Sequence, residues 1–207
     1  MFLKRLLWLC LNLTNLYSQI TDALVDDGYI IIDEALPPKL PQELLKFAKE
    51  QNSYKKAGIS GASDLHLDNS RRRDKTLWLD EDNGVQSEYL AWTEGLRAYL
   101  NQSLYLGLSY FETHFAVYEE GDFYEKHLDT FKNFKNRVVT VVYYLNEEWR
   151  ESDGGELVIY DKDDNYLTKV LPKGNKMIIF MSEKFPHEVL PAKSTRYSIA
   201  GWFRVDR

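Results

Sequence analysis

The stretch YEKHLDTFKNFKNRVVTVVYYL, residues 124–145, joins a His-Leu-Asp motif to the longest β-rich run of the chain. The run Arg137–Leu145 consists mainly of β-branched and aromatic residues, which favour strands. Residues i and i+2 of an extended segment point to the same side, so His127 and Asp129 can face one metal ion. This stretch therefore predicts a β-rich fold with a pair of metal ligands at a strand edge.

Two residues further along the chain complete a candidate site. His187 follows the apolar run Met177–Phe180, and Arg196 opens the terminal β-rich run Tyr197–Val205. Two imidazoles and one carboxylate can occupy one face of Fe(II) and leave the opposite positions open, as in non-haem iron oxygenases. The guanidinium of Arg196 can hold a carboxylate of a second ligand through two parallel hydrogen bonds. Together these residues predict an iron enzyme with an acidic co-substrate.

A second His-Leu-Asp motif, at residues 66–68, is an alternative metal site. His127 and Arg137 follow it at plausible distances, so spacing alone does not decide between the two sets. Residues 60–73 are rich in Ser, Asp, Asn and Arg, a composition typical of a polar loop. We therefore assign the metal to the downstream set and interpret His66 as a loop residue.

The remaining sequence predicts one mainly β domain with supporting α-helices. From Phe111 onward, short and evenly spaced strands with Gly and Asp turns fit a double-stranded β-helix, or jelly roll. One helix is expected to begin at Pro41 and a second to cover Ser87–Asn101, each with one apolar face against a sheet. The expected organisation is an N-terminal apolar segment at 1–20, an α/β supporting region at 21–110, and a jelly-roll core at 111–207 that forms one domain with that region.

Composition limits the cellular setting and the partners. The 207 residues carry a formal net charge of −6, which argues against a nucleic-acid partner. The single cysteine, Cys10, excludes a disulfide framework and favours a reducing compartment, so we expect a cytoplasmic protein.

The N-terminus has features of a leader sequence. Lys4 and Arg5 precede the apolar run 6–13, but Asn12 interrupts that run and no small-x-small cleavage site follows. We favour a packed or loosely attached helix, or an overextended start, over a leader and an exported protein. No stretch is long enough to span a membrane.

The sequence resembles the Fe(II)- and 2-oxoglutarate-dependent dioxygenases, and within them the prolyl hydroxylases that include the oxygen sensors acting on hypoxia-inducible factor. The resemblance extends from Gly28 to Arg207. The segment Arg72–Trp78 resembles the oxygen-sensor subgroup and its bacterial relatives and is more specific than the metal ligands. The other motifs are Tyr118 and Tyr124 before the His-Leu-Asp motif, YYLN at 143–146, GGEL at 154–157, PHEV at 186–189, TRY at 195–197, and Trp202.

The resemblance implies roles for the residues of the site. The two histidines and the aspartate would hold Fe(II), with 2-oxoglutarate and O2 as co-substrates and ascorbate in a supporting role. Arg196 and Tyr144 would bind the distal carboxylate of 2-oxoglutarate, with Tyr118 as a further contact. Burying that carboxylate without a charged donor would be costly.

The resemblance also implies a substrate side. It places Arg137, Trp202 and Tyr124 around the target residue, and Asp74 and Trp78 on a loop that could close over a peptide. The expected reaction is hydroxylation of a prolyl residue in a protein, with oxidative decarboxylation of 2-oxoglutarate to succinate. Elongation factor Tu is a candidate substrate, because bacterial members of this branch are associated with it.

Two features depart from the expected pattern: the relative facing of Arg137 and Tyr144, and the residue at position 200. Arg137 and Tyr144 are an odd number of residues apart and would face opposite sides of an unbroken strand, so either a bulge intervenes or one assignment is wrong. Ala200 stands where the oxygen sensors carry a threonine that helps to bind the co-substrate. The affinity for 2-oxoglutarate would then depend more strongly on Arg196 and Tyr144.

Two other classes of function remain open. A hydroxylase of free amino acids or small metabolites would use the same scaffold without a peptide-closing loop. A non-catalytic jelly-roll binding module would form no succinate. Nucleic-acid demethylation is disfavoured by the acidic charge balance and by Trp202, which stands where a second arginine would follow Arg196. The sequence makes no prediction of the oligomeric state.

Overall fold

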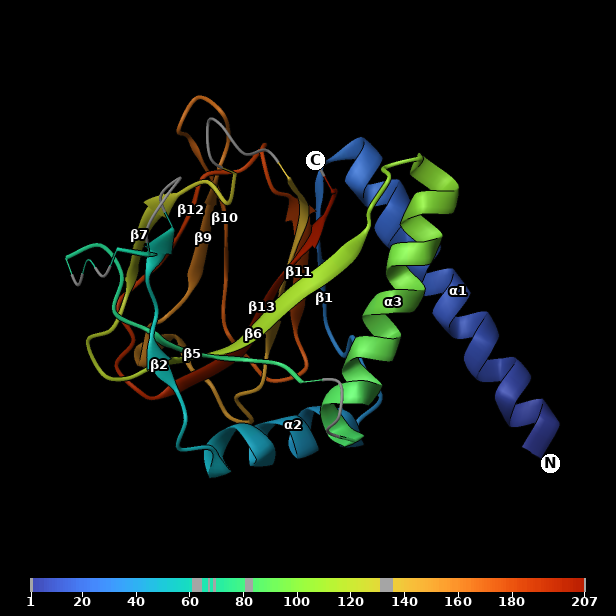
Figure 1. Ribbon diagram of the computed structural model, residues 1–207, viewed down its shortest axis with the longest axis horizontal. Coiled ribbons are helices and arrows are strands. Elements are labelled where there is room, and N and C mark those ends of the chain that lie inside the picture. Colours follow the sequence, from blue (N-terminus) through green and yellow to red (C-terminus); the bar gives the residue numbers. More distant parts are fainter. Residues whose placement is uncertain are drawn as a thin grey trace.

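Two antiparallel sheets pack face to face in the computed structural model, and helices cover the outer face of the larger sheet (Figure 1). The structure describes residues 2–60, 65–66, 68, 70–80, 84–130 and 136–206. The larger sheet has the order β1 (Tyr29–Ile32), β11 (Met177–Met181), β8 (Arg137–Tyr144), β13 (Arg196–Arg204), β6 (Tyr110–Tyr118), β5 (Lys75–Trp78) and β2 (Lys55–Lys56). The smaller sheet has the order β10 (Tyr166–Val170), β9 (Leu157–Tyr160), β12 (His187–Val189) and β7 (Tyr124–His127). The structure also contains a short strand pair, β3 (Ile59–Ser60) and β4 (Leu65–His66), and a 3-10 helix at Glu151–Asp153.

Three helices, α1 (Phe2–Asp26), α2 (Lys39–Glu50) and α3 (Gly84–Leu104), form the outer layer. Each predicted helix is present, and both extend a few residues beyond the predicted limits. The second half of α1 packs on α3, where the Tyr17 hydroxyl donates a hydrogen bond to the carbonyl oxygen of Trp92 at 2.9 Å. In the described part of the chain, no helix is long and apolar enough to cross a membrane.

Strand β8 shows why the core has two halves. Val139, Val141 and Tyr143 belong to the cluster shared with the helices, whereas Val142 and Tyr144 belong to the cluster between the sheets. Alternate residues of a strand point to opposite faces, so a strand covered on both faces is apolar throughout. The predicted mainly β fold with supporting helices and a jelly-roll core is confirmed.

The pairing of β8 with β13 contains an irregularity that places the site residues. Phe203 pairs with Val139, but the next residue, Arg204, pairs with Arg137, so one residue of β8 is skipped. A bulge of this kind reverses the facing of the residues beyond it. Arg137 therefore points to the same side of the strand as Tyr144, which removes the conflict found in the sequence.

Candidate metal centre and co-substrate site

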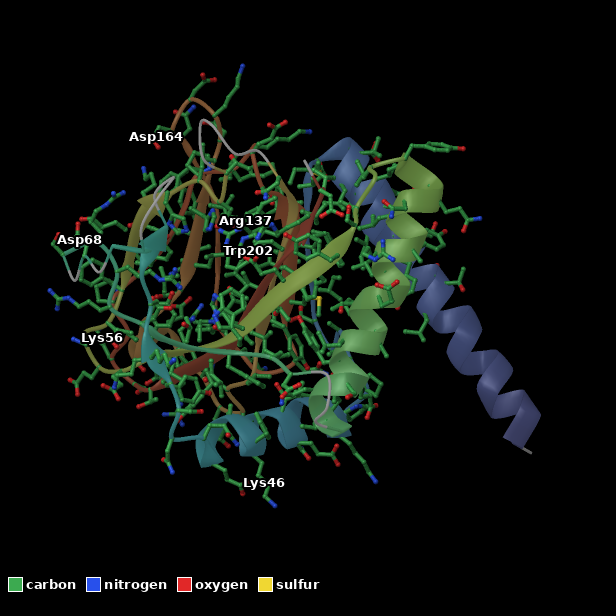
Figure 2. All side chains as sticks on the ribbon, in the orientation of Figure 1. Lys46, Lys56, Asp68, Arg137, Asp164 and Trp202 are labelled. Carbon is green, nitrogen blue, oxygen red and sulfur yellow. The ribbon has the colours of Figure 1, made fainter. Side chains whose placement is uncertain are left out.

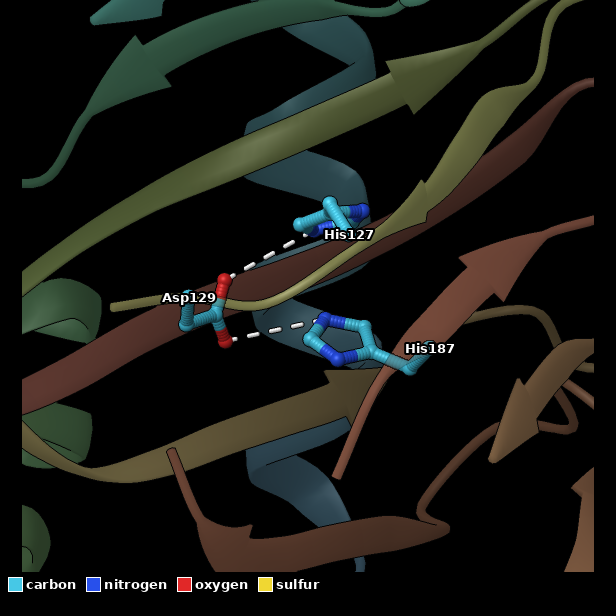
Figure 3. A group of neighbouring side chains, drawn as sticks. All are labelled: His127, Asp129 and His187. Carbon is cyan, nitrogen blue, oxygen red and sulfur yellow. Dashed lines mark ion pairs between the residues drawn. The ribbon is translucent and has the colours of Figure 1, made fainter. Parts of the chain in front are cut away.

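The three candidate metal ligands lie together at the smaller sheet, with both histidines in its strands and Asp129 in the connection after β7 (Figure 3). His127 ends β7 and pairs with His187 at the start of β12, while Asp129 lies two residues beyond β7. Their ligand atoms all lie within 4.8 Å of one another. The Nε2 atoms of the histidines are each 3.6 Å from a carboxylate oxygen of Asp129.

Backbone carbonyls orient both imidazoles. Nδ1 of His127 is 2.7 Å from the carbonyl oxygen of Glu125, and Nδ1 of His187 is 3.0 Å from that of Phe185. A ring that donates from Nδ1 presents its Nε2 lone pair to a metal, which is the usual arrangement around a histidine ligand. The sequence predicts the ligands, and their backbone partners two residues upstream supply the orientation.

The charge states of the ligands suit a divalent cation. Burial alone would raise the pKa of Asp129, but the two imidazoles and Arg137 lower it well below its usual value. Burial lowers the pKa of His187 to about 4, although the carboxylate of Asp129 opposes this shift. The hydroxyl of Thr140 donates to Oδ2 of Asp129 at 2.7 Å and fixes the carboxylate. Asp129 is therefore ionised and His187 neutral, the states in which they bind a metal.

Arg196, the first residue of β13, lies in the larger sheet with its side chain turned toward the cavity. It is 1% exposed, and its Nη1 donates to the Ser198 hydroxyl at 3.1 Å. Its guanidinium carbon is 4.7 Å from the ring centroid of Tyr118 and 5.1 Å from that of Tyr144. Among the described residues, Arg196 has no carboxylate partner, and its Nε and the Tyr144 hydroxyl have no hydrogen-bond partner.

A buried guanidinium without an anion is costly, so this arrangement indicates a binding site for a carboxylate. Burial raises the pKa of Tyr144 to about 12, although Arg196 opposes the shift, so the phenol remains a donor. A dicarboxylate with one end at Arg196 and the other at the metal fits the donors that the chain provides. The residues present thus fit both Fe(II) and 2-oxoglutarate.

Two consecutive glycines precede β9, and one of them makes room for Arg196. Gly155 has φ +68°, and a Cβ at this position would lie 3.0 Å from Cδ of Arg196. Gly154 has φ +66°, and its Cβ would lie 2.5 Å from the carbonyl oxygen of Pro191. Only glycine adopts such a backbone without strain, which explains the paired glycines before β9.

One cavity of about 220 Å³ joins the metal ligands to the arginine. Figure 2 shows Arg137 and Trp202 together in the interior between the sheets, where the guanidinium carbon of Arg137 lies 3.6 Å from the Trp202 ring centroid. Tyr144, predicted to contact the co-substrate, does not line the cavity, although its ring lies close to the Arg196 guanidinium. The predicted site residues that line the cavity are His127, Asp129, His187, Arg196, Tyr118, Tyr124, Arg137, Trp202 and Trp78.

Asp74 lies behind the cavity wall. It is 0% exposed, and its two carboxylate oxygens accept hydrogen bonds from Arg72 at 2.6 and 2.8 Å. Arg72 in turn lies over the Tyr124 ring at 4.5 Å, and that ring stacks on His127 with centroids 3.6 Å apart. The resemblance predicts that Asp74 contacts the substrate. In the structure Asp74 is instead buried as the ion-pair partner of Arg72 and does not line the cavity.

The alternative His-Leu-Asp motif is not assembled into a comparable group. Oδ1 of Asp68 accepts hydrogen bonds from the amide and hydroxyl of Ser70 within a turn. Figure 2 shows Asp68 at the outer edge of the molecule, away from Arg137. The side chain of His66 lies outside the described residues. Within the described ranges, the cluster of three in the smaller sheet is the only such group of metal-ligating residues.

Four residues of the site were not singled out from the sequence. Arg72 and His114 line the cavity, Thr140 holds the metal-ligand carboxylate, and Ser198 contacts Arg196. The two-residue spacing of strands could have found Ser198, which faces the same side as Arg196.

Comparison with known proteins identifies the family of the chain. The sequence profile of the 2OG-Fe(II) oxygenase superfamily matches residues 113–204. Human Egl nine homolog 1 is 38% identical over 85 residues, and human prolyl hydroxylase EGLN3 is 34% identical over 85 residues. Each match covers 40% of this chain, but only 20% and 35% of the respective relative.

Among the solved structures that match, two with high TM-scores cover nearly the whole chain. A prolyl-4-hydroxylase from Pseudomonas putida has a TM-score of 0.83 and 34% identity, covering 92% of this chain and 100% of its own. A prolyl hydroxylase from Trichoplax adhaerens, in complex with a hypoxia-inducible factor peptide fragment, has a TM-score of 0.83 and 26% identity, with coverages of 95% and 92%. The chain belongs to the 2OG-Fe(II) oxygenase superfamily. The predicted resemblance to prolyl hydroxylases is confirmed.

Proposed function

We propose that this protein is a Fe(II)- and 2-oxoglutarate-dependent prolyl hydroxylase that modifies a proline within a segment of another protein. The main support is the buried guanidinium of Arg196. It has no carboxylate partner in the described residues and lines the same cavity as the three candidate metal ligands. The similar prolyl hydroxylases, one of them bound to a peptide, support the choice of proline.

Different residues of the chain have different roles in the proposed reaction. When bound, Fe(II) supplies the oxidation chemistry, in which O2 and 2-oxoglutarate yield succinate, CO2 and one hydroxyl group on the substrate carbon. Arg196, with the Tyr144 phenol behind it, binds the distal carboxylate and orients the co-substrate. Thr140 holds the Asp129 carboxylate in place for the metal.

The substrate is proposed to enter past the larger sheet. Trp78 is 56% exposed at the rim, whereas Trp202 is 7% exposed inside. Together with Tyr124 and Arg137, these residues supply aromatic faces and one cation around the cavity. Aromatic grooves suit proline-containing segments, which are extended and lose little entropy on binding. Elongation factor Tu stays a candidate substrate through the resemblance alone.

Mass spectrometry of a cell lysate incubated with the protein, Fe(II), 2-oxoglutarate and ascorbate tests the proposal. We expect one or a few proteins to gain a single oxygen atom on a proline. Purified elongation factor Tu is included as a separate substrate. Asp129→Ala should abolish the modification and the formation of succinate, because two imidazoles alone hold Fe(II) weakly. Asp68→Ala, the matched control in the other motif, should retain both.

Two outcomes would replace the proposal. Turnover of free proline as efficient as that of any peptide would make the protein a metabolite hydroxylase. No succinate with any substrate, although the metal binds, would make it a binding module. Activity lost in Asp68→Ala and retained in Asp129→Ala would move the metal site to the alternative motif.

A further inference from the structure

His114 lies in the cavity wall and has no part in the chemistry assigned so far. It belongs to β6, is 3% exposed, and lines the cavity. The strand register places it in one row with Val142, Ala200 and Trp78 across four neighbouring strands. Two of these neighbours are apolar, and the indole of Trp78 only donates hydrogen bonds. The imidazole is therefore the one side chain of this row that can accept a hydrogen bond.

Two indoles hold the ring in position. The centroid of the His114 ring lies 5.2 Å from that of Trp78, with the rings at 87°, and 5.5 Å from that of Trp202, at 56°. Nδ1 lies 3.2 Å from the carbonyl oxygen of Phe115. Donation from Nδ1 leaves Nε2 as the acceptor, and within the described part of the chain no hydrogen bond reaches Nε2.

The surroundings keep this imidazole neutral. Burial and the cations Arg72 and Arg137 together lower the pKa of His114 to about 4, although the carboxylate of Asp74 and the Phe115 carbonyl partly oppose them. At neutral pH, Nε2 therefore carries a free lone pair between an exposed indole and a buried one. A ligand that passes Trp78 toward the interior meets an acceptor at this point.

We propose that His114 is a substrate-positioning residue whose Nε2 accepts a hydrogen bond from a backbone N–H beside the target proline. Proline has no N–H of its own, so the amide of an adjacent residue is the nearest main-chain donor. This hydrogen bond would fix the register of the peptide and so select which proline reaches the metal. The inference rests on the proposed function, because it requires a peptide substrate.

His114→Phe is the central variant, because phenylalanine keeps a ring between the two indoles and removes the acceptor. The assay uses a pooled library of synthetic peptides that each carry one central proline. We expect the half-saturating peptide concentration to rise about tenfold, the usual effect of one neutral hydrogen bond. The half-saturating 2-oxoglutarate concentration and the peptide-independent decarboxylation of 2-oxoglutarate should stay at the wild-type level. His114→Gln, whose amide oxygen is an acceptor, should restore part of the loss.

Peptides with one methylated amide identify the donor. N-methylation of the amide before or after the proline removes one N–H at a time. At one of these two positions, methylation should raise the half-saturating peptide concentration of the wild type about tenfold. The same methylation should not raise that of His114→Phe any further. This non-additivity in a double-mutant cycle is expected only of two groups in contact. A merely structural role for His114 would leave the two losses additive.

The outcomes separate this inference from the proposed function. If the wild type decarboxylates 2-oxoglutarate but hydroxylates no peptide, the peptide substrate class fails and the role of His114 fails with it. If the wild type hydroxylates peptides and His114→Phe has the same peptide dependence, the role of His114 alone is overturned. A raised half-saturating 2-oxoglutarate concentration in His114→Phe would assign the residue to the co-substrate instead.

Discussion

The side chain of Arg196 lacks a carboxylate partner among the described residues, and its proposed role in binding 2-oxoglutarate yields the first prediction. Arg196→Lys keeps the positive charge but loses the planar fork that binds a carboxylate through two hydrogen bonds. We expect the half-saturating 2-oxoglutarate concentration to rise about tenfold or more, measured as succinate formed. The free energy of unfolding should change little.

Arg204→Lys is the matched control for this substitution. Arg204 ends the same strand, but its guanidinium pairs with the carboxylate of Glu112. The control should leave the 2-oxoglutarate dependence unchanged. Equal effects of the two substitutions, or none at Arg196, would contradict the assignment of the co-substrate anchor.

His114 also predicts a pH dependence of stability. The pKa of His114 is about 4 in the folded protein, whereas the usual pKa of histidine is 6.5, so the unfolded state binds more protons between these pH values. The contribution of His114 to the free energy of unfolding is therefore fully present above pH 6.5. It falls by about 3 kcal/mol as the pH drops toward 4. His114→Phe removes this contribution, while other titrating groups such as His187 remain in both proteins.

Urea unfolding of the metal-free wild type and His114→Phe at pH values between 4 and 7 measures the difference. The free energy of unfolding should fall more steeply with acid in the wild type than in the variant. Parallel curves would show that the imidazole is not neutral and buried in the folded protein.

The strands differ in how far the sequence predicts them. Strands β8 and β13 are long, rich in β-branched and aromatic residues, and were predicted within a few residues. Strand β5 lies in the segment predicted as a loop, since its KTLW sequence is short and half polar. It is a strand because it pairs with β6, a partner remote in the chain. Short strands of this kind depend on tertiary pairing rather than on their own pattern.

The same limit applies to the residues of the site. The metal ligands and Arg196 carry their own chemistry, and they could be singled out from their residue types together with their positions beside the β-rich runs. The role of Asp74 depends on Arg72, whose guanidinium reaches across to Tyr124 on another strand. The sequence shows the residue types in such a chain of contacts but not the contacts themselves.

The connection before β9 carries the third prediction. Gly155→Ala introduces a Cβ at φ +68°, only 3.0 Å from Cδ of Arg196. The backbone penalty is about 1–2 kcal/mol, and the contact should also displace the arginine. We expect a lower free energy of unfolding together with a higher half-saturating 2-oxoglutarate concentration.

Gly121→Ala separates these two effects. Gly121 has φ +84°, but a Cβ there would meet nothing within 4 Å. It should lose similar stability and keep the 2-oxoglutarate dependence of the wild type. A raised 2-oxoglutarate requirement in both variants would mean that general loosening, rather than contact with Arg196, weakens the co-substrate site.

At the scale of the whole molecule, the site exists only when the two sheets pack together. The smaller sheet contributes the histidines from β7 and β12, and the larger sheet contributes Arg196 from β13. The outer face of the larger sheet is covered by the helices, so its position depends on their packing. Within the described ranges no helix residue lines the cavity, so we expect the helices to act on the site only through the larger sheet.

The last prediction tests whether α1 belongs to this cooperative unit. Ile20 is 0% exposed in the core beneath α1, so Ile20→Ala should lower the free energy of unfolding by about 3 kcal/mol. Val25, on the same helix, is 60% exposed, and Val25→Ala should change it by less than about 0.5 kcal/mol. Urea unfolding followed by far-ultraviolet circular dichroism and by tryptophan fluorescence should give one shared transition for each variant. If Ile20→Ala unfolds like the wild type, or if the two signals separate, α1 is an appendage and the jelly roll is stable without it.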